Sequence, residues 1–177
     1  KTPGGLIALR NNASAFVITH ELGHTLGLGH TNLIRCPNNV SDGVWSSCNA
    51  IEYGGAVDVM SNVDVQGPLS TYHQWRMGII KDSDITQVWK TQSIDLKYTN
   101  SPTGTRAIFV RDGKQTYWIE FRKVADGYTP GLAIYRTDPP PASSVVSPNV
   151  SDGVDAPNDA VTSDVWLMNL DSFKYSS

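Results

Sequence analysis

The sequence predicts an α+β protein in which a helical, loop-rich part precedes a strand-rich part. Two stretches, 12–26 and 70–79, have the composition and the capping residues of helices. The segment between them is rich in Gly, Asn, Ser and Pro, which is typical of turns. After Lys81 the pattern changes to a period-two alternation of apolar and polar residues, which is typical of half-buried strands.

The first predicted helix is "NASAFVITHELGHTL", residues 12–26. Asn11 or Asn12 can cap its start, and Gly27 can adopt the left-handed conformation that commonly ends a helix. A second, shorter helix follows, with Ser70 as its cap and "TYHQWRMGI" as its body. The region between them, from Gly29 to Gly67, is expected to be turns and loops.

Six strands are predicted in the second part of the chain. Asp112-Gly113 between two of them is a strong β-hairpin signal, and the Pro-rich stretch 138–164 is expected to be a long exposed loop. We therefore expect two regions, 1–80 and 81–177, the second an all-β, sandwich-like accessory domain. The predicted strands are 85–89, 93–98, 106–112, 115–124, 131–138 and 165–170.

The composition restricts the possible function classes. Apolar residues make up 40% of the chain and charged residues 18%, a balance that favours a folded protein over a disordered one. The net charge of −3, with no cluster of Lys or Arg, gives no electrostatic basis for binding nucleic acid. The longest apolar runs are far too short to span a membrane.

Two cysteines, Cys36 and Cys48, lie in a turn-rich stretch with no neighbouring Cys or His at a zinc-finger spacing. This pattern favours a disulfide, which would stabilise the fold by about 3 kcal/mol in the chain-entropy model. Two free thiols in a reducing compartment are the alternative. A disulfide predicts an exported, extracellular protein.

The stretch "HELGHTLGLGH" contains three of the four histidines of the chain. On a helix, His20 and His24 are four residues apart and point toward one centre. Gly27 ends the helix, so the chain can turn back and bring His30 to the same centre. Three imidazoles leave a fourth position open for water, which is typical of a catalytic zinc site rather than a structural one. Glu21, beside His20, can act as general base toward that water.

The pattern H-E-x-x-H-x-x-G-x-x-H resembles the signature of the metzincin zinc endopeptidases. "DVMSN" places Met60 where that clan has its methionine-containing turn, the Met-turn. "EYGGAVDVMS" followed by "LSTYHQWRMGII" is most similar to the gametolysin-type secreted peptidases, with Gly78-Ile79 departing from the family's Gly-Trp. Some metzincins have a metal-contacting tyrosine two residues after the Met; here that position is Asn62, so no such ligand is expected.

The resemblance implies that residues 1–80 hold the active-site helix, the Met-turn and the following helix of a metzincin-like catalytic domain. It further implies a secreted, zinc-dependent hydrolase that cleaves peptide bonds in protein or peptide substrates without a covalent intermediate. The alternative is a binding or adhesion module built on a protease scaffold. An intact Glu21 favours the enzyme, because a scaffold does not need the general base.

Metzincins generally have a β-sheet before the zinc helix, whereas only about ten residues precede it here. The apolar residues of this helix also require a partner on the side away from the zinc. We therefore expect this chain to be the C-terminal part of a longer catalytic unit, with the sheet on a companion N-terminal chain.

Other residues are weaker candidates for functional roles. Tyr53, Tyr72 and His73 are candidates for stabilising an oxyanion, although each is more simply a packed aromatic residue. Glu120 is expected to face solvent or an ion-pair partner on a half-buried strand. Calcium is a candidate second ion, because four aspartates of the long loop could supply oxygen ligands, although their spacing does not match the calcium loop of EF-hands. They are Asp152, Asp155, Asp159 and Asp164.

Overall fold

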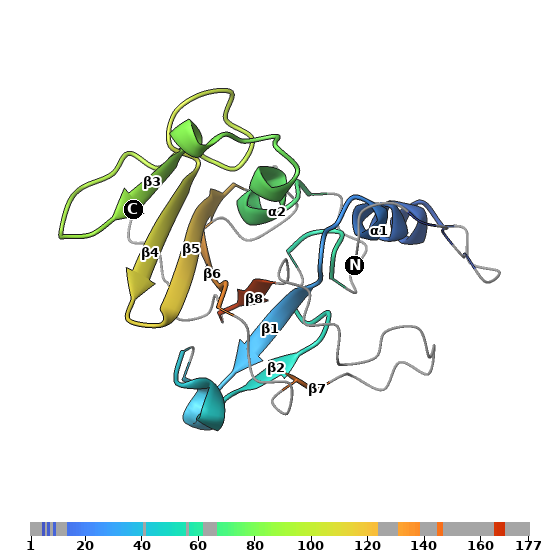
Figure 1. The fold of residues 1–177 in the computed structure, drawn as a ribbon, viewed down its shortest axis with the longest axis horizontal. Helices are drawn as coiled ribbons and strands as arrows, with labels where there is room; N and C mark the ends of the chain where they lie inside the picture. The colour runs from blue at the N-terminus through green and yellow to red at the C-terminus, as the bar shows by residue number, and fades with distance from the viewer. Residues whose placement is uncertain are drawn as a thin grey trace.

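The computed structural model contains helices and a mixed β-sheet, which confirms the α+β class (Figure 1). It describes residues 5, 7, 9, 14–40, 42–55, 57–61, 67–123, 131–138, 145–146 and 165–168. The helices are α1 (Ala15–Thr25) and α2 (Thr71–Arg76), with short 3₁₀ turns η1 (Pro37–Asn39), η2 (Trp45–Ser47) and η3 (Asp82–Asp84). None of the described helices is long and apolar enough to cross a membrane.

The strands are β1 (Thr31–Arg35), β2 (Asn49–Ile51), β3 (Ile85–Val88), β4 (Ala107–Asp112), β5 (Gln115–Arg122), β6 (Gly131–Arg136), β7 (Val145–Val146) and β8 (Val165–Leu167). They form one sheet in the order β3-β4-β5-β6-β8-β1-β2-β7. The pairs β3–β4, β8–β1 and β2–β7 are parallel and the other pairs are antiparallel. Figure 1 shows β8 between the β3–β6 half of the sheet and the β1–β2 hairpin.

Helix α1 begins later than the sequence predicted. Its N-cap is Ser14, whose hydroxyl accepts a hydrogen bond from the Val17 N–H at 3.2 Å. Serine is among the best N-cap residues, so the helix needs no cap further upstream. Asn11 and Asn12, the predicted caps, lie outside the described residues. For α2 the predicted cap is confirmed, because Ser70 Oγ accepts from the His73 N–H.

Five of the six predicted strands are present, one is absent, and three strands lie where loops were predicted. β3, β4, β5, β6 and β8 lie within predicted segments, and the β4–β5 hairpin turns at Gly113, which has φ +59°. Residues 93–98 form no strand, and only Tyr98 makes an isolated bridge to Phe121. β1 and β2 lie in the predicted loop region and β7 in the predicted long loop. These short strands are stabilised by pairing with distant segments, which local composition does not reveal.

The predicted disulfide is present between Cys36 and Cys48, and it links the segments that follow β1 and precede β2. The loop it closes is also held to the second half of the chain. Asp42 accepts hydrogen bonds from the Arg136 guanidinium at 2.7 Å and from the Tyr117 hydroxyl at 2.6 Å. Arg136 is almost completely buried, and its charge is balanced by Asp42 and by Asp138, which also accepts from the guanidinium.

The main apolar core combines residues from both sides of the predicted boundary at residue 81. Tyr72 and Trp75 of α2 pack against Trp118 of β5, with ring centroids 5.4 Å and 5.6 Å apart. Val57 and Leu167 belong to the same cluster. The division at residue 81 and the sandwich-like form of the second region stay predictions from sequence pattern, but sheet and core packing cross that boundary.

Glu120, predicted to face either solvent or an ion-pair partner, is buried beside an ion-pair partner. On β5 the buried side chains are Trp118, Glu120 and Arg122. Glu120 accepts from the Arg122 guanidinium (2.6 Å), the Tyr135 hydroxyl (2.7 Å) and the backbone and hydroxyl of Thr71 (2.5 and 2.7 Å). The ion-pair alternative was therefore right. The buried carboxylate is tolerated because both of its oxygens accept hydrogen bonds.

Candidate metal centre

The end of α1 explains how one short stretch can bring three histidines together. Gly27, with φ +86°, donates to the His24 carbonyl at 2.9 Å, and Leu28 donates to the Gly23 carbonyl at 3.0 Å. These two bonds are the Schellman motif, which reverses the chain at a left-handed residue. The reversal carries His30 back beside the last turn of the helix, as the sequence predicted.

The three imidazoles converge through the same ring nitrogen. His24 Nε2 lies 3.1 Å from His20 Nε2 and 3.0 Å from His30 Nε2. All three side chains are buried, with at most 8% of their surface exposed. The cluster can therefore hold a metal ion through one nitrogen from each histidine.

The other ring nitrogen of each histidine faces an acceptor. His20 Nδ1 lies 2.7 Å from the Val59 carbonyl, and His24 Nδ1 lies 2.9 Å from the Leu28 carbonyl. A carbonyl oxygen only accepts, so Nδ1 must carry the proton in both rings, and in a neutral imidazole Nε2 then keeps its lone pair. His30 Nδ1 faces a carboxylate oxygen of Glu52 at 3.2 Å.

This arrangement fits a metal ion better than a hydrogen-bonded histidine cluster. Lone pairs on nitrogens 3.0–3.1 Å apart repel one another unless a cation lies among them. Zinc–nitrogen bonds of about 2.0–2.1 Å in a tetrahedron place two nitrogens roughly 3.4 Å apart, close to the spacing seen here. An acceptor on the second ring nitrogen is the arrangement that fixes histidine ligands in metal sites.

Met60 packs against Gly23, which lies between His20 and His24 on α1. It is fully buried, and a methyl group placed on Gly23 would overlap its Sδ and lie 3.1 Å from its Cε. Its backbone carbonyl accepts from the Thr31 N–H at 2.8 Å, and the preceding Val59 carbonyl accepts from His20. The turn at Met60 thus contacts both the helix and the residue that follows His30.

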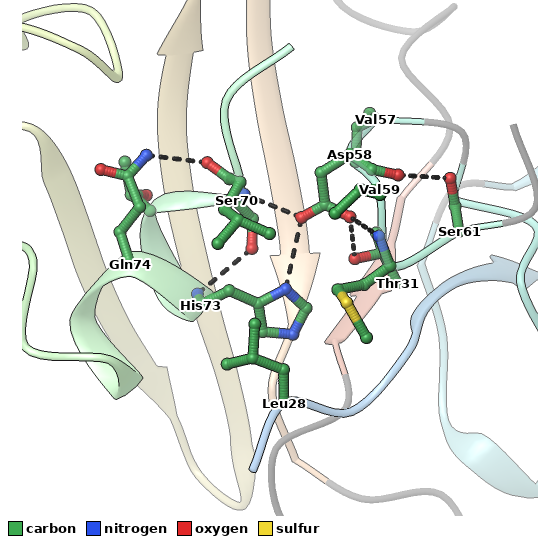
Figure 2. A network of polar contacts seen from close by, with 12 residues as sticks. Leu28, Thr31, Val57, Asp58, Val59, Ser61, Ser70, His73 and Gln74 are labelled. Carbon is green, nitrogen blue, oxygen red and sulfur yellow. Dashed lines mark hydrogen bonds and ion pairs between the residues drawn. The ribbon is translucent and has the colours of Figure 1, made fainter. Parts of the chain in front are cut away.

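Asp58 fixes this turn, as Figure 2 shows. One carboxylate oxygen accepts from the Thr31 hydroxyl (2.7 Å) and the Met60 N–H (3.0 Å), and the other accepts from the Ser70 N–H (2.8 Å) and faces His73 Nδ1 (3.3 Å). Burial alone would raise the pKa of Asp58. Hydrogen bonds and nearby positive charge, chiefly from His73, outweigh burial and hold this pKa well below its usual range.

The other predicted site residues lie at varied positions. Glu21 follows His20 on α1 and is half-buried. The Tyr53 ring lies 4.0 Å from the His30 ring and 5.9 Å from the His20 ring, measured between centroids. Tyr72 belongs to the apolar core, and His73 is fully buried beside Asp58, so both have structural roles there.

Two residues close to the site, Glu52 and Asp58, were not recognised from the sequence. Glu52 begins the "EYGG" stretch and Asp58 comes two residues before Met60. Their closeness in sequence to Tyr53 and Met60, which were candidate site residues, could have identified them. Asn62 and the four aspartates considered as calcium ligands lie outside the described residues.

No protein-family model, no curated protein and no solved structure matches this chain.

Proposed function

We propose that this chain is a secreted, zinc-dependent endopeptidase of the metzincin type. The observation that carries the proposal is the convergence of three buried imidazoles. His24 Nε2 lies 3.1 Å from His20 Nε2 and 3.0 Å from His30 Nε2. The Nδ1 atom of each ring faces an acceptor. Three imidazole ligands with a further coordination position are typical of catalytic zinc sites.

His20, His24 and His30 would hold the ion. Zinc lowers the pKa of water toward about 7 and polarises a carbonyl group. Glu21 is adjacent to the first ligand in sequence, and its carboxylate would accept a proton from the attacking water and pass it to the leaving amine. Peptide-bond hydrolysis by this route needs no nucleophilic side chain.

Two further features support the metzincin assignment. Met60 is a buried residue in a turn directly beneath the histidine-bearing helix, where that clan has its Met-turn. Gly27 of the signature takes the left-handed conformation that reverses the chain toward His30. The Cys36–Cys48 disulfide supports export, since such bonds persist in oxidising compartments.

The exposed face of α1 carries apolar side chains, and we expect the companion chain to cover it. Ile18, Leu22 and Leu26 follow one another at intervals of four residues and are 39%, 46% and 49% exposed. Such a row forms one stripe along a helix, on roughly the opposite side from His20 and His24. Native mass spectrometry of an active sample tests the companion chain. Activity of the 177-residue species alone at a normal metalloprotease rate would refute it.

The alternative is a binding or adhesion module in which hydrolysis is incidental. The experiment that separates the two is cleavage of casein by the metal-loaded chain, purified together with any companion chain, with and without a zinc chelator and alongside the Glu21→Gln variant. If the chain is a zinc endopeptidase, it cleaves casein, and both the chelator and the Glu21→Gln substitution abolish this cleavage. Cleavage that survives both, or no cleavage by stoichiometrically loaded protein together with its companion, would contradict it.

A further inference from the structure

The turn after β2 contacts the third histidine with two successive residues. Glu52 Oε1 lies 3.2 Å from His30 Nδ1, at the edge of the ring. The side chain of Tyr53 packs against the same ring, with centroids 4.0 Å apart and planes inclined by 45°. His20 and His24 instead have backbone carbonyls at the corresponding nitrogen. His30 is thus the one described member of the cluster with a carboxylate at Nδ1.

The backbone of this turn has a conformation that residues other than glycine rarely adopt. Tyr53 has φ +59°, which for a bulky residue costs of order 1–3 kcal/mol. Its N–H donates to the side-chain oxygen of Asn32, a buried residue of β1, at 2.8 Å. The left-handed residue allows Glu52 and Tyr53, which are neighbours in sequence, to approach one imidazole together.

The glycines that follow lock the turn against β1. Gly55 donates to the Thr31 carbonyl at 3.0 Å, and a Cβ at this position would lie 2.6 Å from that oxygen. Gly54 donates to the Ile51 carbonyl and would place a Cβ 2.9 Å from the Leu33 side chain. Only residues without a side chain fit so close to β1, so the turn has little freedom to shift away from His30.

Burying the Glu52 carboxylate costs free energy. It is 8% exposed, and among the described residues its second oxygen, Oε2, is buried without a hydrogen-bond partner. A buried carboxylate with an unsatisfied oxygen is unfavourable unless nearby positive charge compensates it. Three neutral imidazoles around a dication leave a net positive centre, and Glu52 lies one ring away from it.

We propose that Glu52 is a positioning residue for the metal: it fixes the tautomer and the orientation of His30, and its charge offsets that of the ion. This inference rests on the proposed metal binding by the three histidines. Because Glu52 acts through His30, it is not a ligand. Outer partners of this kind typically change metal affinity by 10–100-fold.

The test measures zinc affinity and metal-free stability on the same variants of the full chain. Zn²⁺ alone is the probe, competed against a chromophoric chelator, and urea unfolding of the metal-free protein reports the fold. Glu52→Leu is expected to weaken zinc binding 10–100-fold while leaving the urea midpoint of the metal-free form unchanged or higher, since an unsatisfied buried charge is removed. Glu52→Gln keeps an acceptor for the His30 N–H and is expected to bind zinc more tightly than Glu52→Leu.

Asp95→Asn, which removes a carboxylate with 81% of its side-chain surface exposed, is the matched control and should bind zinc like the unmodified chain. Unchanged zinc affinity in Glu52→Leu, or equal affinities of the Leu and Gln variants, would overturn the positioning role. The positioning role would also be overturned if Glu52→Leu lowered the urea midpoint of the metal-free protein enough to account for the whole loss of zinc affinity. Failure of the unmodified chain to bind stoichiometric zinc would instead refute the proposed function itself.

Discussion

Replacing Gly23 with alanine tests the contact between the histidine-bearing helix and the Met60 turn. Gly23 lies between His20 and His24 on α1 and is buried. A methyl group there would overlap Met60 Sδ and lie 3.1 Å from Cε, whereas carbon atoms in ordinary contact are roughly 3.5–4.0 Å apart. The thioether must therefore move for the alanine to fit.

Two opposing effects determine how much Gly23→Ala changes the free energy of unfolding. Alanine in place of glycine within a helix stabilises it by about 0.5–1 kcal/mol. Overpacking a filled core costs about 1–3 kcal/mol. Met60 is fully buried, so its thioether can move only against other packed side chains, and its backbone is held by Asp58 on one side and Thr31 on the other. Overpacking should prevail, with a net loss of about 1–2 kcal/mol in the free energy of unfolding.

The assay is a double-mutant cycle measured by urea unfolding of the metal-free protein. Met60→Ala removes the overlapping atoms, so in that background Gly23→Ala should stabilise the fold by about 0.5–1 kcal/mol. The sign of the same substitution therefore reverses, with a coupling energy of about 2 kcal/mol between the two positions. Equal effects of Gly23→Ala in both backgrounds would refute the contact and the placement of Met60 beneath the helix.

Three further predictions concern the site and its supports. Glu21→Gln should keep zinc and the fold but lose turnover by about 10²-fold or more, since the neutral amide cannot accept a proton; more than about a tenth of the activity remaining would contradict its role as general base. Native, unreduced protein should resist alkylation at Cys36 and Cys48, as intact mass shows, and labelling of both without reduction would exclude the disulfide. The pKa of Asp58 is lower in the folded state than its value of about 3.9 in unfolded chains, so its contribution to stability is present above about pH 4 and is lost as the pH falls toward the folded-state value. Urea unfolding between pH 7 and pH 3 should show this loss in the unmodified chain and a smaller one in Asp58→Asn; parallel pH profiles would rule out the linkage.

The sequence by itself determined the parts of this protein that depend on local spacing. His20 and His24 share a helix face because four residues make about one turn. Gly27 reverses the chain because it adopts φ +86° at low steric cost. Ser70 caps α2 through its own hydroxyl, and Gly113 turns the β4–β5 hairpin. Each of these features is settled by residues within a few positions of one another.

The tertiary structure alone decided the features that join segments distant in the chain. β1, β2 and β7 lie in segments whose composition predicts turns and loops, and they exist through pairing with one another and with β8. The buried face of β5 could not be chosen from alternation, because Glu120 and Arg122 satisfy each other's charge beneath α2. Glu52 reaches His30 across 22 positions and Asp58 reaches Thr31 across 27. A buried carboxylate is stable only where its hydrogen-bond donors converge, and that convergence is a property of the folded chain.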